Sequence, residues 1–83
     1  MATASEIVIM AGYDTIETDT SSEFRAWSED GESGIAAEER ADLVDPETQE
    51  PVFRGVRLDA DGHPDGEPVW GSSMAGVVAA LVG

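Results

Sequence analysis

The segment 59–67 has residue types and a spacing that suit the binding of a hard cation. Its sequence is Asp-Ala-Asp-Gly-His-Pro-Asp-Gly-Glu, in which carboxylates alternate with other residues around a glycine turn. The EF-hand pattern fails, because counting from Asp59 puts Pro64 where the sharp-turn glycine belongs and Trp70 where the bidentate glutamate belongs. We therefore expect a solvated turn that uses aspartate and glycine for its backbone geometry, with no bound metal or other cofactor. The weak candidates for metal ligands are Asp59, Asp61 and Asp65.

Enzyme chemistry finds little support in the residue types of the chain. His63 is the only histidine and so the only ready general base. A Ser-His-Asp arrangement with Ser72 or Ser73 lacks the strand, Gly-x-Ser-x-Gly turn and helix that position a serine nucleophile. Without cysteine or lysine there is neither a thiolate nucleophile nor a Schiff base. We therefore expect a protein that is not an enzyme.

The charge of the chain is strongly one-sided, with 18 acidic side chains, four arginines and a formal net charge of −14. Such a charge repels phosphate backbones and anionic membranes, so we expect no direct binding to nucleic acid or to a membrane. Two carboxylates about 7 Å apart in water repel by roughly 0.6 kcal/mol. Many such pairs together rival the stability of a small domain. Either concentrated salt, with a Debye length of about 3 Å at 1 M, or a basic partner must offset this repulsion.

The loss of basic residues is a true depletion, since arginine has not replaced the missing lysine. Together with abundant Asp, Glu, Thr, Ala, Val and Gly, this composition resembles that of proteins from salt-in halophiles, such as haloarchaea and their viruses. The resemblance implies adaptation to a salty solvent and names no protein family. Two alternatives stay open. One is an acidic inhibitor that mimics nucleic acid through the carboxylates between Asp14 and Glu50, and the other is an ordinary acidic domain.

The 83 residues correspond to a single small acidic domain, 1–83. Without cysteine there is no disulfide framework. The apolar run 7–11 follows no basic stretch and is too short for the core of a signal peptide. The uncharged stretch 68–83 is also short of the roughly 20 apolar residues that a membrane span needs. We expect a soluble protein, located in the cytoplasm or in a virion.

Apolar patterning predicts several short elements in the first half of the chain. The β-branched run 6–13 predicts a strand buried on both faces, and the polar stretch 14–22 predicts a loop or an exposed edge. Residues 23–28 alternate and carry two aromatic side chains, which predicts a strand that turns at 29–31. The alanine and glutamate content of 35–42 favours one or two helical turns, with a strand as the competing interpretation.

The second half of the chain predicts hairpins and a terminal helix. Asp45-Pro46 opens a turn, and a strand at 52–58 follows it. This strand would place Val52, Arg54, Val56 and Leu58 on one face. Because that face puts an arginine among apolar residues, the strand would be bulged near Gly55 or half-buried at Arg54. A second hairpin is expected at 67–70. Residues 72–82 favour a helix, with a buried strand as the alternative. The expected fold is α+β: a small, mostly antiparallel β-hairpin domain with one or two short helices, the last at the C-terminus.

The uneven distribution of carboxylates suggests where the chain makes contact. Thirteen of the 18 lie between Asp14 and Glu50, and the segment 68–83 has none. That segment must be buried in the domain's own core or against another chain. We expect a non-enzymatic assembly or protein-interaction subunit, such as a structural virion component of a halophilic organism or its virus. It would dock onto a protein partner or a second copy through Trp70, Met74, Val77, Val78 and Leu81.

Overall fold

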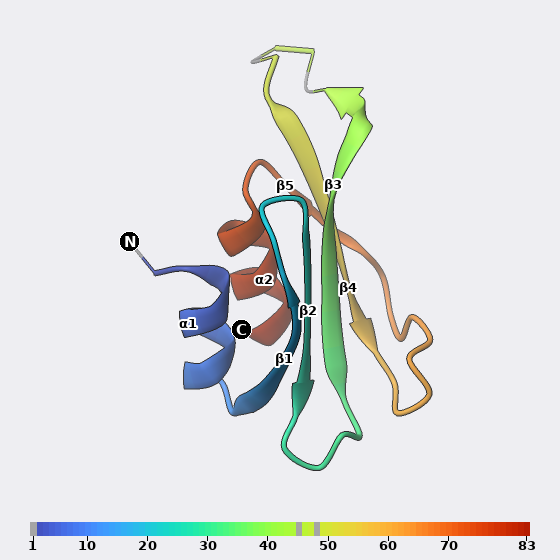
Figure 1. The fold of residues 1–83 in the computed structure, drawn as a ribbon. Coiled ribbons are helices and arrows are strands. Elements are labelled where there is room, and N and C mark those ends of the chain that lie inside the picture. The colour runs from blue at the N-terminus through green and yellow to red at the C-terminus, as the bar shows by residue number, and fades with distance from the viewer. Residues whose placement is uncertain (1, 45, 48) are drawn as a thin grey trace.

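The computed structural model describes residues 2–44, 46–47 and 49–83 as a five-stranded antiparallel sheet with two helices on one of its faces (Figure 1). Each strand pairs with the next one along the chain, so the sheet order is β1-β2-β3-β4-β5. This α+β architecture with a C-terminal helix confirms the expected fold class. The elements are α1 (Ala4–Met10), β1 (Tyr13–Asp19), β2 (Glu23–Ser28), β3 (Gly34–Val44), β4 (Pro51–Leu58), β5 (Val69–Gly71) and α2 (Met74–Val82).

The prediction of a buried strand at 6–13 is wrong, because most of that run forms helix α1. Thr3 and Glu6 have the spacing of a capping box, and the Thr3 hydroxyl accepts a hydrogen bond from the Glu6 N–H at 3.3 Å. Ala4 and Val8, four residues apart, are buried on one side of the helix. A β-branched run of this length is ambiguous between helix and strand, and the cap with its narrow apolar stripe decides for the helix.

The competing strand interpretation of 35–42 is the correct one, because these residues belong to β3. Ile35 and Ala37 are buried towards the helices, while Glu38, the next residue of the strand, lies on the opposite face and is exposed. β3 pairs with β2 on one side and with β4 on the other. Pairing on both sides therefore outweighs the helix propensity of alanine and glutamate.

The sequence predicts either a loop or an exposed edge for 14–22, and the exposed edge is correct, because most of this stretch forms β1. β1 lies at the margin of the sheet and carries two bulges, between Tyr13 and Thr15 and between Ile16 and Thr18. Bulges and carboxylates on an edge strand discourage pairing with another chain. β1 is thus a poor place for a partner strand to add.

The two predicted hairpin strands are confirmed at 23–28 and, with one extra residue, at 51–58. β5 pairs with β4, which confirms a further hairpin near 67–70. Of the two alternatives for this strand, a bulge near Gly55 is wrong, because the ladder between β3 and β4 is continuous there, and a half-buried Arg54 is correct. The irregularity of the ladder lies between Arg40 and Val44. The predicted turn at Asp45-Pro46 includes residues outside the described ones.

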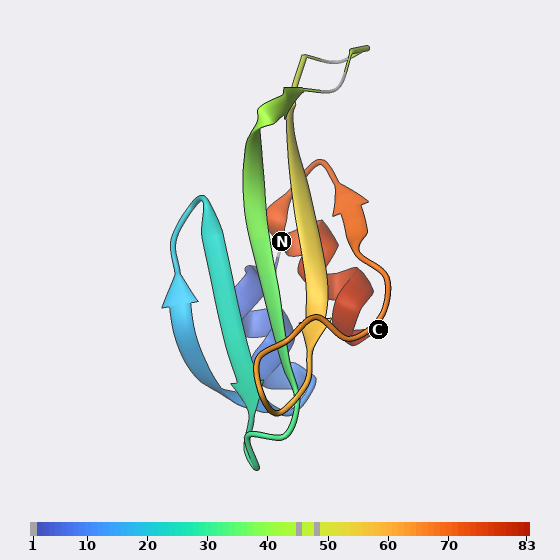
Figure 2. The same cartoon turned by 90° about the vertical axis from the view of Figure 1, so that its right-hand side faces the viewer.

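The core lies between the helices and one face of the sheet. Phe24 and Ile35 come from the sheet, and Val8, Val77 and Val78 from the helices. α2 begins after Ser73, whose hydroxyl accepts from the Gly76 N–H at 3.1 Å as an N-cap. Figure 2 looks onto the opposite face of the sheet and shows both helices behind it. This face is left without a helical cover.

Gly55 sets how closely α2 approaches β4. A Cβ at this position would overlap Val77 and lie 2.7 Å from Leu81 Cδ1. Overpacking of a tight core costs about 1–3 kcal/mol. We expect Gly55→Ala to lower the free energy of unfolding by that amount, measured by denaturant titration in molar KCl. Ser72→Thr adds the same methyl group at an exposed position and should unfold like the wild type. Equal stability of the two variants would contradict this account of the packing.

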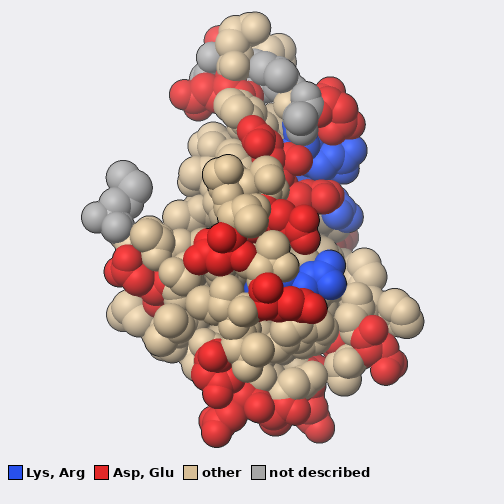
Figure 3. Space-filling view, viewed as in Figure 1, with Lys and Arg blue, Asp and Glu red and all other residues tan. Residues whose placement is uncertain are grey.

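Carboxylates cover much of the surface, and the visible arginines gather on the side of the uncovered sheet face (Figure 3). With four arginines for 18 acidic groups, most carboxylates have no arginine to pair with. We expect the midpoint of thermal unfolding, followed by far-UV circular dichroism, to rise by roughly 10–20 °C from dilute buffer to molar KCl, because screening removes several kcal/mol of repulsion. Sucrose of equal osmolarity should give a smaller rise. An unchanged midpoint would contradict the electrostatic argument.

Candidate interaction surface

The sheet face opposite the helices, here called the open face, is formed by the side chains that alternate with the core residues. Phe24 and Ala26 point to the core in β2, so Arg25 and Trp27 point to the open face. By the same alternation it holds both tryptophans and three of the four arginines of the chain. These side chains are Arg25, Trp27, Arg40, Arg54 and Trp70.

One row of side chains crosses four strands of the open face. Glu23 pairs with Glu38, Glu38 with Arg54, and Arg54 with Trp70. The Arg54 guanidinium lies over the Trp70 ring, 5.9 Å from its centroid, in a cation–π contact. Trp70 nevertheless remains 49% exposed. The row is therefore acidic at its β2 end and cationic and aromatic at its β5 end.

A smaller network near β1 involves Glu17, Arg25 and Trp27. The Trp27 indole Nε1–H donates to Glu17 Oε2 at 3.0 Å, and Arg25 Nε lies 3.8 Å from the same oxygen. Among the described residues, Arg25 Nε is buried without a hydrogen-bond partner. An ion pair this long and this exposed stabilises little. Arg25 is thus only loosely held by its own chain.

The other two arginines are held firmly. Arg40 donates from Nε and Nη2 to both carboxylate oxygens of Asp42, at 3.1 and 2.9 Å. This hydrogen bonding holds the pKa of Asp42 below its ordinary value, so the pair is intact at neutral pH and is lost as acid protonates Asp42. Arg57, on the core side, donates from Nε to the Leu81 carbonyl at 2.8 Å and ties the end of α2 to β4. Arg54, by contrast, is within ion-pair distance of no carboxylate among the described residues.

The segment 59–68 folds back over one end of the open face (Figure 2). The Asp65 N–H donates to the Arg57 carbonyl at 2.8 Å, and the segment buries Leu58 beneath it. A cavity of about 210 Å³ remains between the segment and the long side chains of the row, with Arg25 and Arg54 in its lining. The part of the open face that the segment leaves uncovered, around Arg54 and Trp70, stays accessible.

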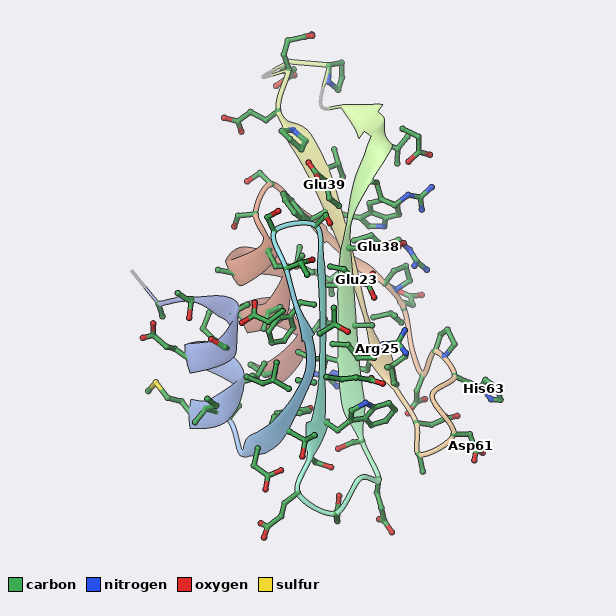
Figure 4. All side chains as sticks on the ribbon, in the orientation of Figure 1. Glu23, Arg25, Glu38, Glu39, Asp61 and His63 are labelled. Carbon is green, nitrogen blue, oxygen red and sulfur yellow. The ribbon has the colours of Figure 1, made fainter. Side chains whose placement is uncertain are left out.

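The predicted cation segment is brought together only in part. Ligand atoms of Asp59, Asp61 and His63 lie within 4.8 Å of one another, and Asp65 is not among them. Asp59 Oδ1 accepts from the N–H groups of Asp61 and His63, at 3.0 and 2.9 Å, which closes the turn in the manner of an Asx-turn. Figure 4 shows Asp61 and His63 on the outer side of this segment. The arrangement is the expected turn geometry.

The predicted docking residues divide between the core and the surface. Val77, Val78 and Leu81 are only 1%, 0% and 3% exposed and pack against the chain's own sheet, so the folded domain keeps them from a partner. Met74 is partly buried against the same core, and Trp70 alone lies well exposed. An apolar stripe shows that a segment must be buried, but not against which surface. Docking stays a prediction, and of the five residues predicted for it only Trp70 presents a large exposed side chain.

Sequence reasoning missed the open face as a unit. Glu23, Glu38 and Trp70 lie far apart in the chain, and only the register of the sheet aligns them. A partial signal was present, because alternation in 23–28 already separates Arg25 and Trp27 from the core residues Phe24 and Ala26. Which strands are neighbours was the missing information.

No family model matches this chain, and comparisons with curated proteins and with solved structures give no match either. Among the described residues, no helix has both the length and the apolar character required to cross a membrane. A function for the chain therefore has to be argued from its surface.

Substitution of Asp59 distinguishes a turn from a cation site. We expect Asp59→Ala to lower the free energy of unfolding by about 1–2 kcal/mol, since two backbone N–H groups lose their acceptor. Asp59→Asn keeps an acceptor oxygen and should be close to wild type. Thermal unfolding with and without calcium measures both variants. Equal damage from Asn and Ala, together with stabilisation of the wild type by calcium, would contradict the turn interpretation.

Proposed function

We propose that this chain is a non-enzymatic protein-interaction or assembly subunit, adapted to concentrated salt, that docks through its open face. The observation that carries the proposal is the gathering of both tryptophans and three of four arginines on a sheet face that no helix covers. Tryptophan and arginine are the residue types most enriched at the energetic centres of protein interfaces. Here they stand on paired strands that hold them rigidly.

The charge of the chain supports the same proposal. Arginine is scarce in this sequence, and the fold places most of it on one face. Arg54 is stacked on a half-exposed ring with no carboxylate partner among the described residues, so it can pair with an acceptor from outside. We propose a halophilic organism or its virus as the setting, and a multimeric assembly such as a virion as one context, because the composition suits a solvent that screens charge.

The acidic mimic of nucleic acid remains the runner-up. The turn 29–32 and the described residues of the β3–β4 connection, 46–47 and 49–50, lie at opposite ends of the molecule (Figure 1). The acidic residues of these two segments, Glu29, Asp30 and Glu32 against Glu47 and Glu50, therefore do not form a single phosphate-like row, which supports a docking subunit. Salt also separates the two functions. A mimic would lose its basic partner as salt rises, whereas the subunit keeps its partner while gaining stability.

A photo-crosslinking amino acid at position 70 tests the docking face in the producing cells. We expect discrete adducts to a protein from position 70, because the ring it replaces is half exposed at the proposed contact. The control places the same group at Met10, which is 86% exposed on α1 in the helix layer, and should give none. Adducts are resolved by gel and identified by mass spectrometry. The same diffuse background from both positions would contradict docking through the open face.

A further inference from the structure

We propose that the partner at the open face is a second copy of this chain, docked face to face about a twofold axis that runs along β3. This inference rests on the proposed docking function and names its partner. Two copies of a chain with a net charge of −14 repel over most of their surfaces. Their contact must therefore form where the charge is locally balanced and where each copy complements itself.

The open face is locally balanced. Its three arginines lie among a similar number of carboxylates, namely Glu17, Glu23, Glu38 and Asp42. The segment 59–68 adds Asp59, Asp61, Asp65 and Glu67 at the end of the face that it covers, so the balance holds for the part that this segment leaves uncovered. Arg57 is the only remaining arginine. A second acidic copy thus meets the least net repulsion at this face.

The cross-strand row also makes the face complementary to itself. β2 and β4 lie on either side of β3, and the row places Glu23 on β2 and Arg54 on β4. A twofold axis along β3 lays β2 of one copy over β4 of the other. Glu23 of each copy then faces Arg54 of the other, which gives two equivalent ion pairs in an isologous interface. Aligned sheets pack in this manner about 10 Å apart.

The centre of the row fits the same axis. Glu38 lies on it, so the two copies of this side chain approach each other. Each has Arg54 as its cross-strand neighbour and Arg40 two residues along the same strand. The pKa of Arg40 is raised mainly by its hydrogen bond to Asp42, and proximity to Glu38 adds to the shift. These cations offset the repulsion between the two carboxylates. Trp70 extends the contact beyond the charged centre.

The size of the face limits the strength of the dimer. Five strands about 4.8 Å apart, over three to four rows of side chains, offer roughly 500 Å² per copy. Because the segment 59–68 covers one end of the face, the contact concentrates on the cross-strand row that contains Arg54 and on the next row, which contains Arg40. The two sheets diverge towards that segment. A total near 1,000 Å² is at the low end for specific complexes. The dimer is therefore weak and depends on protein concentration.

Charge reversal tests the pairing. Glu23→Arg and Arg54→Glu each place like charges opposite one another, and we expect each to weaken dimerisation by about tenfold or more. The double variant restores opposite charges and should dimerise like the wild type. Sedimentation equilibrium in molar KCl measures the association, and thermal unfolding confirms that each variant folds. Two controls in the helix layer make the same changes in net charge. The single variant Glu6→Arg matches Glu23→Arg, and the double variant Met10→Glu with Ala79→Glu matches Arg54→Glu. Both controls should leave dimerisation unchanged.

A second measurement does not depend on charge. The chain has no cysteine, so Glu23→Cys and Arg54→Cys each carry a single thiol. A mixture of the two variants with a short bis-maleimide should give more crosslinked dimer than either variant alone, because the axis brings position 23 of one copy to position 54 of the other. Equal crosslinking in all three samples would overturn the proposed axis.

The remaining results separate this inference from the docking function. A wild type that stays monomeric at all concentrations, or a double variant that fails to recover, overturns the second copy as partner. If position 70 nevertheless gives adducts to a different protein, the docking function stands. A monomer without such adducts overturns both.

Discussion

The packing of α2 across β4 at Gly55 is the contact on which the rest of the structure depends. The missing side chain lets Val77 and Leu81 reach the sheet, so the apolar face of the last helix is used within the domain. Arg57 adds a hydrogen bond from β4 to the Leu81 carbonyl at the helix end. Because two helices of seven and nine residues cover only one face of five strands, the part of the other face that segment 59–68 leaves uncovered must meet solvent or a partner.

A surface of this kind differs from the rest of the molecule in its charge. Over the rest of the chain carboxylates far outnumber arginines, so this surface holds water and keeps other acidic molecules away. The open face mixes arginines, carboxylates and two indole rings, and its best-exposed ring, Trp70, is stacked under Arg54. In the proposed function, solvent adaptation and docking thus occupy different surfaces. The strongly acidic surface would supply solubility in salt, and the balanced face would supply recognition.

Much of the fold could be predicted from the sequence, because strands in a meander pair with their chain neighbours. The strands 23–28 and 51–58 and the C-terminal helix follow from local alternation and spacing. The errors arose where local signals were ambiguous: the short apolar run of α1, and the alanine-rich start of β3. In both cases contacts with distant residues, or a cap, outweighed intrinsic propensity.

The sequence by itself determined the electrostatic character of the chain, since −14 over 83 residues follows from composition and requires screening or compensation in any fold. It also determined that the uncharged C-terminal segment carries apolar side chains that have to be buried, which the structure shows for Val77, Val78 and Leu81. Only the tertiary structure decided what buries it and which residues stand together. Burial depends on which surfaces meet, and the row from Glu23 to Trp70 exists only through strand register, which no local pattern encodes.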